Sequence, residues 1–420
     1  MWRPGSIGDW YSAEDLRALA RAGMSEVPKW LSMDIDEARE RVLNPRNRET
    51  VMRVLAALDQ WRTMSVQQLE ALTDISGFAK GDVSLLSAMW NAGLLEICVL
   101  GAAFRKGPRD RDGILLRPTK KTVMHTEFAE TLSYAEWVSM TAGLDLDADR
   151  QYARHNILAA EFALRISEFG NVGMVLGEKL SSMAMLAYSG VGADVPSSGA
   201  AGSSDLTLIR PDGLRIAVEV TATVSGGWFY DKVEKLVRTL HRRPLAETGL
   251  CVLFVVAPRR DETEAHPRQV MKKVKRDVQK AVQAYPGHAL DPTAARVGVV
   301  SWTDLFPAEG EAAPDFGMLP VERPVGAGYI GNADDESVWV RSHFLNPQSV
   351  PFSPHDTRKM TAVFGNGAGL RGVPHVFRRK PSWKLMSDLV SKRAGLLHLV
   401  GGGRQRGGVK APGIPERMLF

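Results

Sequence analysis

Residues 205–223, DLTLIRPDGLRIAVEVTAT, contain two apolar runs separated by the tetrapeptide RPDG. Pro211 and Gly213 favour a tight turn, and the apolar runs on either side have the composition of strands. The segment therefore predicts a β-hairpin. Asp205 opens its first strand, and Glu219 lies near the end of the second.

Helices and further strands are predicted on both sides of this hairpin. The helical pattern ARHNILAAEFALRISEFG and the short apolar stretch MVLG precede it, and the amphipathic pattern WFYDKVEKLVRTLHRR and the apolar run CVLFVVAP follow it. The order is helix, strand, hairpin, helix, strand. Amphipathic helices combined with buried strands indicate an α/β fold in which helices flank a mixed sheet.

The two acids of the hairpin form a candidate metal site. Carboxylates brought together by adjacent antiparallel strands suit a hard divalent cation, which takes oxygen ligands and keeps some of its waters. We therefore expect Asp205 and Glu219 to bind Mg²⁺ or Mn²⁺. A valine flanks Glu219 on each side, where a buried carboxylate is costly unless it is paired or bound to a metal. The alternative is that both acids are solvated positions at a sheet edge.

This element order, with an Asp opening one strand and a Glu-x-Lys closing the next, resembles the PD-(D/E)XK nuclease superfamily. The matching residues are Asp205 and the triplet Glu219-Val220-Thr221. The resemblance implies a restriction-endonuclease-like core and metal-dependent hydrolysis of DNA. Thr221 stands where the family usually has lysine, so either the site is inactive or the lysine has moved to the next helix, as in some members. Lys232 and Lys235 are the candidates, and we favour Lys235.

Upstream, residues 48–118 show three helical patterns, then a short strand, an Arg-rich tip RKGPRDRDG and the apolar run ILLRPT. This order resembles winged-helix domains, in which the third helix enters a major groove and the wing contacts phosphates. The residues expected to face DNA from the third helix and the wing are Lys80, Ser84, Ser87, Arg105, Lys106 and Arg109. The alternative is a module that docks a protein, because the third helix offers few base-reading side chains.

A narrower resemblance rests on the helix that precedes the hairpin. His155, Asn156, Ala159 and Glu161 in HNILAAEFAL stand ahead of the nuclease-like core and behind the winged-helix pattern. This arrangement is similar to the replication-relaxation family of actinobacterial plasmids and integrative elements. The resemblance implies a role in handling or nicking the DNA of a mobile element, and it implies that His155 and Glu161 belong to the catalytic site.

Charge is distributed unevenly along the 420 residues, whose formal net charge is +5. Residues 358–420 alone carry 13 Lys and Arg against two acids, which favours a polyanionic partner for this end of the chain. Other basic groups follow the hairpin, although a solvated helix face explains them equally well. The candidate DNA contacts in these regions are Arg242, Arg243, Lys272, Lys273, Arg378, Arg379 and Lys380.

The expected organisation has four parts. These are a helical lead-in at 1–47, a winged-helix domain at 48–125, a nuclease-like domain at 126–305, and a Pro/Gly-rich, basic and partly disordered region at 306–420. The only two cysteines, Cys98 and Cys251, each lie in an apolar run and are expected to be buried free thiols. No signal-peptide pattern or long apolar stretch is present, so we expect a cytoplasmic protein without a membrane partner.

Together these features predict a protein that binds double-stranded DNA and nicks it with a divalent cation during plasmid or mobile-element replication or transfer. Two other functions remain open. In one, the nuclease fold is a catalytically inactive DNA-binding scaffold, as the missing Glu-x-Lys lysine would suggest. In the other, the chain recruits replication or transfer proteins and touches DNA only secondarily.

Overall fold

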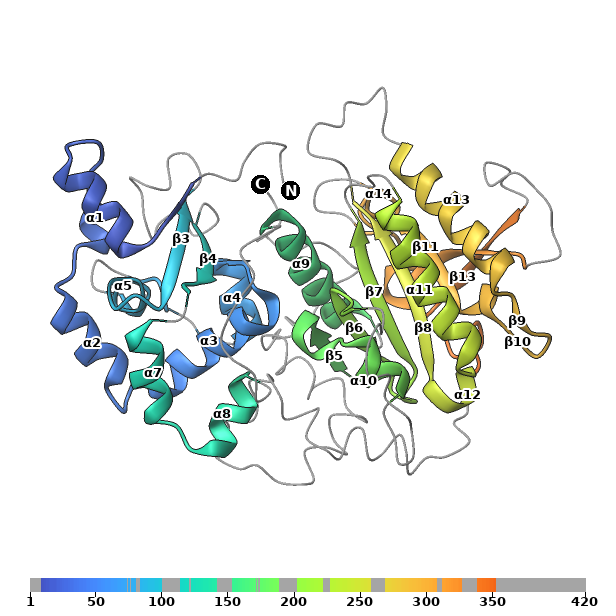
Figure 1. The fold of residues 1–420 in the computed structure, drawn as a ribbon, viewed down its shortest axis with the longest axis horizontal. Coiled ribbons are helices and arrows are strands. Elements are labelled where there is room, and N and C mark those ends of the chain that lie inside the picture. Colours follow the sequence, from blue (N-terminus) through green and yellow to red (C-terminus); the bar gives the residue numbers. More distant parts are fainter. Residues whose placement is uncertain are drawn as a thin grey trace.

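The computed structural model describes residues 9–352, apart from 74, 76, 81–83, 100–113, 121, 142–152, 171, 173, 189–201, 222–226, 258–268, 308–311 and 327–337. Within these residues the chain is an α/β protein, as predicted (Figure 1). No helix in this part of the chain is long and apolar enough to cross a membrane. Cys98 and Cys251 are buried and form no disulfide.

A seven-stranded mixed sheet forms the larger half of the described structure, with strand order β13-β12-β11-β8-β7-β6-β5. β5, β6 and β7 are antiparallel neighbours, whereas β7, β8 and β11 run parallel. The strands are β5 (Met174–Gly177), β6 (Leu206–Ile209), β7 (Arg215–Thr221), β8 (Leu250–Val256), β11 (Val297–Ser301), β12 (Pro320–Pro324) and β13 (Trp339–His343).

The predicted hairpin is confirmed as β6 and β7, joined through the turn at Pro211. Gly213 has φ +91°, a conformation that residues with a Cβ rarely adopt, so the glycine is needed there. The buried guanidinium of Arg210 bonds the carboxylate of Asp212 and the carbonyl of Phe344, at 3.1 Å for the latter. The turn is thereby fixed to the last part of the described chain.

Helices cover both faces of this sheet. α9 (Ala153–Phe169) packs on one face, where Phe162 and Ile166 join the apolar side chains of β5, β6 and β7 in the main core. α11 (Trp228–Arg242) and α13 (Gln269–Ala284) cover the other face, over β8 and β11, with a second core. Figure 1 shows α9 between the sheet and the N-terminal helices, so its buried surface serves both halves.

Short elements complete the sheet half. They are η4 (Glu178–Leu180), α10 (Met183–Tyr188), α12 (Leu245–Thr248), β9 (Gly287–His288), β10 (Asp291–Pro292), η5 (Thr293–Arg296), α14 (Trp302–Leu305) and η6 (Phe316–Met318). The strands β12 and β13 were not predicted, because prolines at both ends of β12 hide its strand character. Proline is compatible with strand ends, where a ladder hydrogen bond is not required.

The elements from β1 to α8, residues 9–141, are named here the N-terminal unit. Its four strands form a sheet in the order β1-β3-β4-β2. The helices are α1 (Ala13–Arg21), η1 (Lys29–Leu31), α2 (Ile35–Leu43), α3 (Arg48–Trp61), α4 (Val66–Thr73), α5 (Leu85–Asn91), α7 (Val123–Glu130) and α8 (Tyr134–Thr141), and the strands are β1 (Trp10–Tyr11), β2 (Met64–Ser65), β3 (Leu95–Val99) and β4 (Ile114–Pro118).

The prediction that Ser84 and Ser87 face outward is wrong. α5 begins only at Leu85, and Ser84 is its buried N-cap, whose hydroxyl accepts a bond from the Ser87 backbone N–H at 3.1 Å. The Ser87 hydroxyl is also buried and accepts from Asn91 Nδ2 at 3.2 Å. Lys80 is exposed, as predicted. The predicted wing contacts Arg105, Lys106 and Arg109 lie outside the described residues.

The end of α3 fixes the N-terminal unit to the sheet half. Lys179 Nζ lies 2.6 Å from Asp59 Oδ2, and both side chains are largely buried. Next to this pair, the Gly177 N–H donates to Gln60 Oε1 at 3.3 Å, and a Cβ at Gly177 would meet the Gln60 carbonyl at 2.9 Å. One apolar core runs from α1 to β7 without interruption. The two halves therefore pack as one body.

The Asp59–Lys179 pair predicts a pH-dependent loss of stability on substitution. Burial, opposed by Lys179 and Arg62, raises the pKa of Asp59 to about 7. Lys179→Met should lower the free energy of unfolding by about 3 kcal/mol where Asp59 is ionised, since one partner of a buried pair is removed. Below that pKa the acid takes a proton, so the loss should shrink. Urea denaturation on either side of pH 7 measures both values.

Arg39→Met is the matched control. Arg39 pairs with Glu127 at 2.7 Å on an exposed surface, with side-chain exposures of 46% and 30%. Such pairs contribute at most about 1 kcal/mol, and this one should show little pH dependence over the same range. Equal losses for the two variants would show that the Asp59–Lys179 pair does not hold the halves together.

Candidate functional site

Asp205 lies immediately before β6 and forms hydrogen bonds with the two residues of β7 that flank Glu219. Its backbone N–H donates to the Val218 carbonyl at 3.0 Å, and its Oδ2 accepts from the Val220 N–H at 2.6 Å. The residue is only 8% exposed. The hairpin thus brings its two acids together at one place on the sheet, as the sequence predicts.

Glu219 is the more deeply placed of the two acids, at 3% exposure in β7. Its Oε2 accepts a bond from Lys232 Nζ. Its Oε1 is buried and has no hydrogen-bond partner among the described residues. A buried carboxylate oxygen without a partner is energetically costly, and such an atom requires an explanation, for example an ion.

His155 reaches this pair from the first turn of α9. Its Nε2 lies 2.7 Å from Asp205 Oδ1, so both oxygens of Asp205 are engaged. The next residue, Asn156, is buried, and its Nδ2 has no partner within the described part of the chain. The structure therefore places His155 in direct contact with Asp205.

A small polar cavity of about 10 Å³ adjoins these side chains. That volume is about the space of one water molecule. Its lining residues come from the end of α3, the start of α9, η4 and the start of β6, and they are Gln60, Trp61, His155, Asn156, Ala159, Glu178 and Asp205. The cavity lies where the N-terminal unit meets the sheet.

Glu178 is a third carboxylate that the sequence analysis missed. It follows β5 directly, and its side chain pairs with Arg62 at 2.8 Å. Arg62 has φ +60° and ψ −51°, and the Thr63 N–H donates to the Trp61 carbonyl across it at 2.6 Å, which defines a strained γ-turn. The sequence signal for Glu178 was its position just after a buried strand. Its closeness to Asp205, however, follows only from the pairing of β5 with β6.

The two central acids have pKa values shifted in opposite directions. Burial would raise the pKa of Asp205, but His155, Lys232 and the Val220 N–H together hold it below its usual value. Burial and the negative charge of Asp205 raise the pKa of Glu219 to about 8, against the opposing effect of Lys232. Two buried acids that share a site cannot both ionise easily. A cation between them would relieve this repulsion.

The basic partners respond to the same two acids. Burial would lower the pKa of His155, but Asp205 and then Glu219 raise it. Burial likewise opposes the charge of Lys232, and Glu219 and Asp205 raise its pKa. Burial also raises the pKa of Glu178, and Arg62 counters part of that effect. The site therefore keeps cationic side chains close to its carboxylates.

Lys232, and not the favoured Lys235, is the lysine of the site. Lys235 is exposed, and it lies three residues further along α11, about 4.5 Å along the helix axis. Because α11 starts beside the end of β7, its first turns lie nearest Glu219. Thr221, at the usual lysine position, is buried at 8% exposure and offers no charge.

Glu161 does not join the cluster, contrary to the implication of the family resemblance. Its carboxylate accepts from Arg165 Nε at 2.6 Å and from Gln68 Nε2 at 2.9 Å. All three side chains are buried. The spacing of six residues from His155 turns Glu161 toward α4, where it holds α9 against the N-terminal unit.

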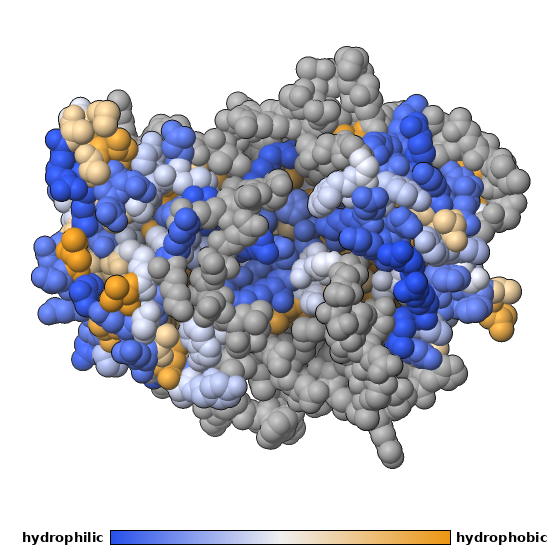
Figure 2. All heavy atoms as spheres, viewed as in Figure 1, coloured by the Kyte–Doolittle hydropathy of each residue, from blue (hydrophilic) through white to orange (hydrophobic). Residues whose placement is uncertain are grey.

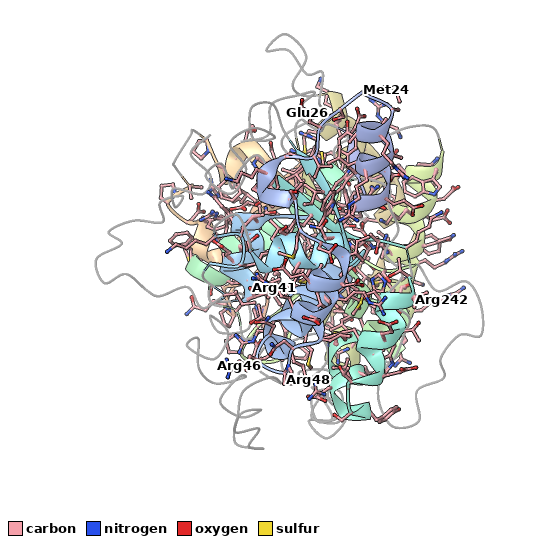
Figure 3. The ribbon with its side chains drawn as sticks, turned by 90° about the vertical axis from the view of Figure 1, so that its left-hand side faces the viewer. Met24, Glu26, Arg41, Arg46, Arg48 and Arg242 are labelled. Carbon is pink, nitrogen blue, oxygen red and sulfur yellow. The ribbon has the colours of Figure 1, made fainter. Side chains whose placement is uncertain are left out.

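Of the four DNA contacts predicted around α11 and α13, two are exposed basic side chains and two lie beside acidic residues. Arg242 and Lys272 are exposed, and Arg242 projects outward in Figure 3. Arg243 lies 3.7 Å from Glu247, and Lys273 lies 2.6 Å from Asp277. Figure 2 shows hydrophilic side chains along the two helices. Arg378, Arg379 and Lys380 lie outside the described residues.

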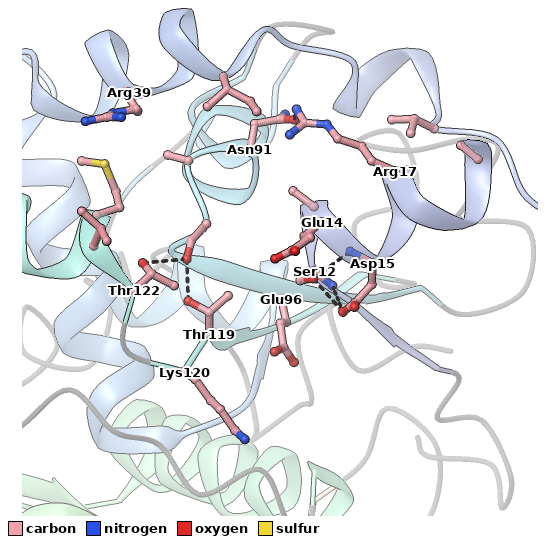
Figure 4. Close-up of a pocket in the computed structure, with 18 of the residues that line it drawn as sticks. Ser12, Glu14, Asp15, Arg17, Arg39, Asn91, Glu96, Thr119, Lys120 and Thr122 are labelled. Carbon is pink, nitrogen blue, oxygen red and sulfur yellow. Dashed lines mark hydrogen bonds between the residues drawn. The ribbon is translucent and has the colours of Figure 1, made fainter. Parts of the chain in front are cut away.

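A wider cavity of about 1020 Å³ lies elsewhere, in the N-terminal unit, between α1, α2, α5 and α7 (Figure 4). Its polar side chains serve local structure. Arg17 bonds Asn91 Oδ1 at 2.5 Å, Thr119 donates to the Gly93 carbonyl at 2.6 Å, and Ser12 caps α1. These groups hold the elements of the unit together, and they do not form a catalytic cluster.

The donor set at Asp205 and Glu219 fits Mg²⁺ or Mn²⁺. Within the described residues, no three His, Cys, Asp or Glu side chains form a complete metal cage. Mg²⁺ does not require one, because it is commonly held by one or two carboxylates and retains several waters. Glu219 Oε1, buried and without a partner in the described part, is the atom that such an ion would satisfy.

Comparisons of the chain with protein-family models, with curated proteins and with solved structures found no match. The geometry of the site is therefore the basis for assigning a function.

The His155–Asp205 pair predicts a measurable pKa. NMR titration of the His155 ring should give a value above the ordinary 6.5, and Asp205→Asn should lower it, because the main raising charge is lost while burial remains. The raised pKa also determines how the pair affects the free energy of unfolding. The stabilisation from the protonated His155 is fully present below pH 6.5 and is lost as the pH rises through the His155 pKa of the folded state.

Asp315→Asn is the control for this titration. Asp315 Oδ2 lies 2.7 Å from His343 Nε2, which makes an analogous acid–histidine pair. His343 is the last residue of the far edge strand, β13. The control should leave the His155 pKa unchanged, and His155→Gln identifies the resonance. A pKa for His155 that does not respond to Asp205→Asn would contradict the described contact.

Proposed function

We propose that the chain is a divalent-cation-dependent nuclease that nicks DNA. The observation that carries the proposal is the buried Glu219 Oε1, which has no partner in the described residues and adjoins Asp205, His155 and Lys232. Two acids, one histidine and one lysine lie together here, and this combination of groups suits the hydrolysis of an anionic phosphodiester.

The order of elements supports this proposal. Apart from the short elements η4, α10 and α12, the chain order is α9, β5, β6, β7, α11 and β8, with three antiparallel strands and then a parallel crossover from β7 to β8. This order resembles the PD-(D/E)XK core, with the lysine moved from Thr221 to Lys232. The resemblance would explain why the two acids of one hairpin and a lysine of the next helix meet.

Each side chain has a distinct role in the proposed reaction. Asp205 and Glu219 would hold Mg²⁺, which when bound supplies positive charge at the phosphodiester. Lys232 neutralises charge that develops on the phosphate oxygens. His155 is held in place by Asp205, which also raises its pKa, so it can donate a proton or a hydrogen bond. Glu178 and Asn156 border the water-sized cavity, where they can orient a water.

The N-terminal unit supports a DNA substrate. Its order α3, β2, α4, α5, β3, β4 resembles that of winged-helix domains. A winged helix joined to a nuclease-like core, with His155 at the start of α9, supports a relationship with the replication-relaxation family. We therefore infer that the substrate is double-stranded DNA of a plasmid or other mobile element, handled during replication or transfer in the cytoplasm.

The nicking proposal predicts a large effect at Glu219. Supercoiled plasmid should be nicked in Mg²⁺ or Mn²⁺, and Glu219→Gln should slow nicking about 100-fold or more, because an electrostatic contribution to the transition state is lost. Lys232→Met should also be slow, whereas Lys235→Met should nick at the wild-type rate. Gel assays of nicked and supercoiled DNA measure all four proteins.

Glu127→Gln is the matched control for the same chemical change. Glu127 also pairs with a basic residue, Arg39, but on the surface of the N-terminal unit. It should nick like the wild type. Equal nicking by wild type and Glu219→Gln would end the catalytic proposal.

Metal binding should depend on pH through Glu219. A ligand must lose its proton before it binds a metal, so Mn²⁺ affinity should rise by up to about tenfold per pH unit below the Glu219 pKa of about 8 and level off above it. Electron paramagnetic resonance of free Mn²⁺ measures this. Glu219→Gln should bind weakly at every pH, and Glu127→Gln should follow the wild type. A flat profile for the wild type would contradict the proposed ligand.

The alternative is an inactive scaffold that binds DNA or recruits a replication protein. The missing Glu-x-Lys lysine favours the inactive DNA-binding scaffold. The buried Ser84 and Ser87 favour the recruiting role, because they remove two of the side chains expected to read bases. A wild-type protein that retains DNA binding but neither nicks plasmid nor binds Mn²⁺ would support this alternative.

A further inference from the structure

Trp228 is unusually exposed for a tryptophan next to a candidate catalytic site. It is the first residue of α11 and is 68% exposed. Its ring lies 5.9 Å from Lys232 Nζ, and Lys232 in turn bonds Glu219. The two residues are four apart on one helix, so they share a face. The indole therefore borders the site and is open to solvent.

The next residue fixes the position of this indole. Phe229 is 3% exposed and packs edge-on against Phe254 of β8, with ring centroids 6.0 Å apart. This contact anchors the first turn of α11 on the sheet. Trp228, one residue earlier, is rotated about 100° away around the helix axis. It is therefore held outside the core by the packing of its neighbour.

Lysines accompany each aromatic ring of this turn. Lys232 lies near Trp228, and Lys280 Nζ lies 4.3 Å from the Tyr230 ring, whereas Lys273, 6.0 Å from the buried Phe229 ring, pairs with Asp277. Proteins bind single-stranded nucleic acid with aromatic side chains, on which the bases stack, and with cationic groups, which contact the phosphates. Paired bases inside a duplex do not offer a free face for stacking.

We propose that Trp228 is a stacking platform for an unpaired base next to the bond that is cut. The substrate of the site is then DNA that is single-stranded or locally melted at the cut, and the flanking duplex is bound elsewhere on the protein. This inference rests on the proposed nuclease function, and it specifies the form of DNA at the cleavage site.

The test compares binding of labelled single-stranded and fully paired oligonucleotides by fluorescence anisotropy, in EDTA so that no strand is cut. Trp228→Ala should weaken single-strand binding about five-fold or more, the factor expected for the loss of one base stack. Duplex binding should change little. Trp228→Phe should restore most of the single-strand affinity, because the phenyl ring retains a face for stacking.

Tyr134→Ala is the control, since Tyr134 is also an exposed aromatic at the start of a helix, at 82% exposure on α8 of the N-terminal unit. It should bind both DNAs as the wild type does. An unchanged single-strand affinity in Trp228→Ala, an equal loss on duplex, or a wild type that does not bind single strands would overturn the inference. The nuclease proposal is judged separately, by nicking in Mg²⁺, so failure of one is distinguishable from failure of the other.

Discussion

Two carboxylates buried side by side on adjacent strands constrain everything around them. Asp205 and Glu219 lose most of their hydration and repel each other, and burial together with the charge of Asp205 raises the pKa of Glu219 to about 8. The pKa of Asp205 stays below its usual value because His155, Lys232 and the Val220 N–H outweigh the effect of burial. Such an arrangement is stable only with positive charge nearby. Lys232 and His155 provide this charge, and one Glu219 oxygen, Oε1, has no hydrogen-bond partner in the described residues.

The positive charge reaches the acids from separate parts of the chain. Lys232 is positioned by the start of α11, and His155 by the start of α9. α9 in turn packs against α4 through Glu161, and the end of α3 is held to η4 by Asp59 and Lys179. The order of the site therefore depends on both halves of the described structure, although the two acids belong to one hairpin.

Local features of the sequence were sufficient to predict the hairpin and its two acids. Pro211 and Gly213 determine the turn from neighbouring residues alone, and the alternation of strand and helix patterns determines the α/β class. The choice between Lys232 and Lys235 was wrong because it depends on where α11 begins relative to β7. Ser84 and Ser87 were misplaced for the same reason, since a helix that begins at Leu85 turns them inward. Glu178 required the pairing of β5 with β6, which no local pattern supplies.

The junction at α3 has a consequence for the way such a protein would act. Arg62 occupies a strained backbone turn at the end of this helix and still reaches Glu178 beside the acids. Among the described residues, a continuous apolar core joins the N-terminal unit to the sheet, and the two pack as one body. If the former grips a duplex and the latter cuts, the protein would work as a molecular ruler, with a constant offset in nucleotides between the sequence it holds and the bond it breaks.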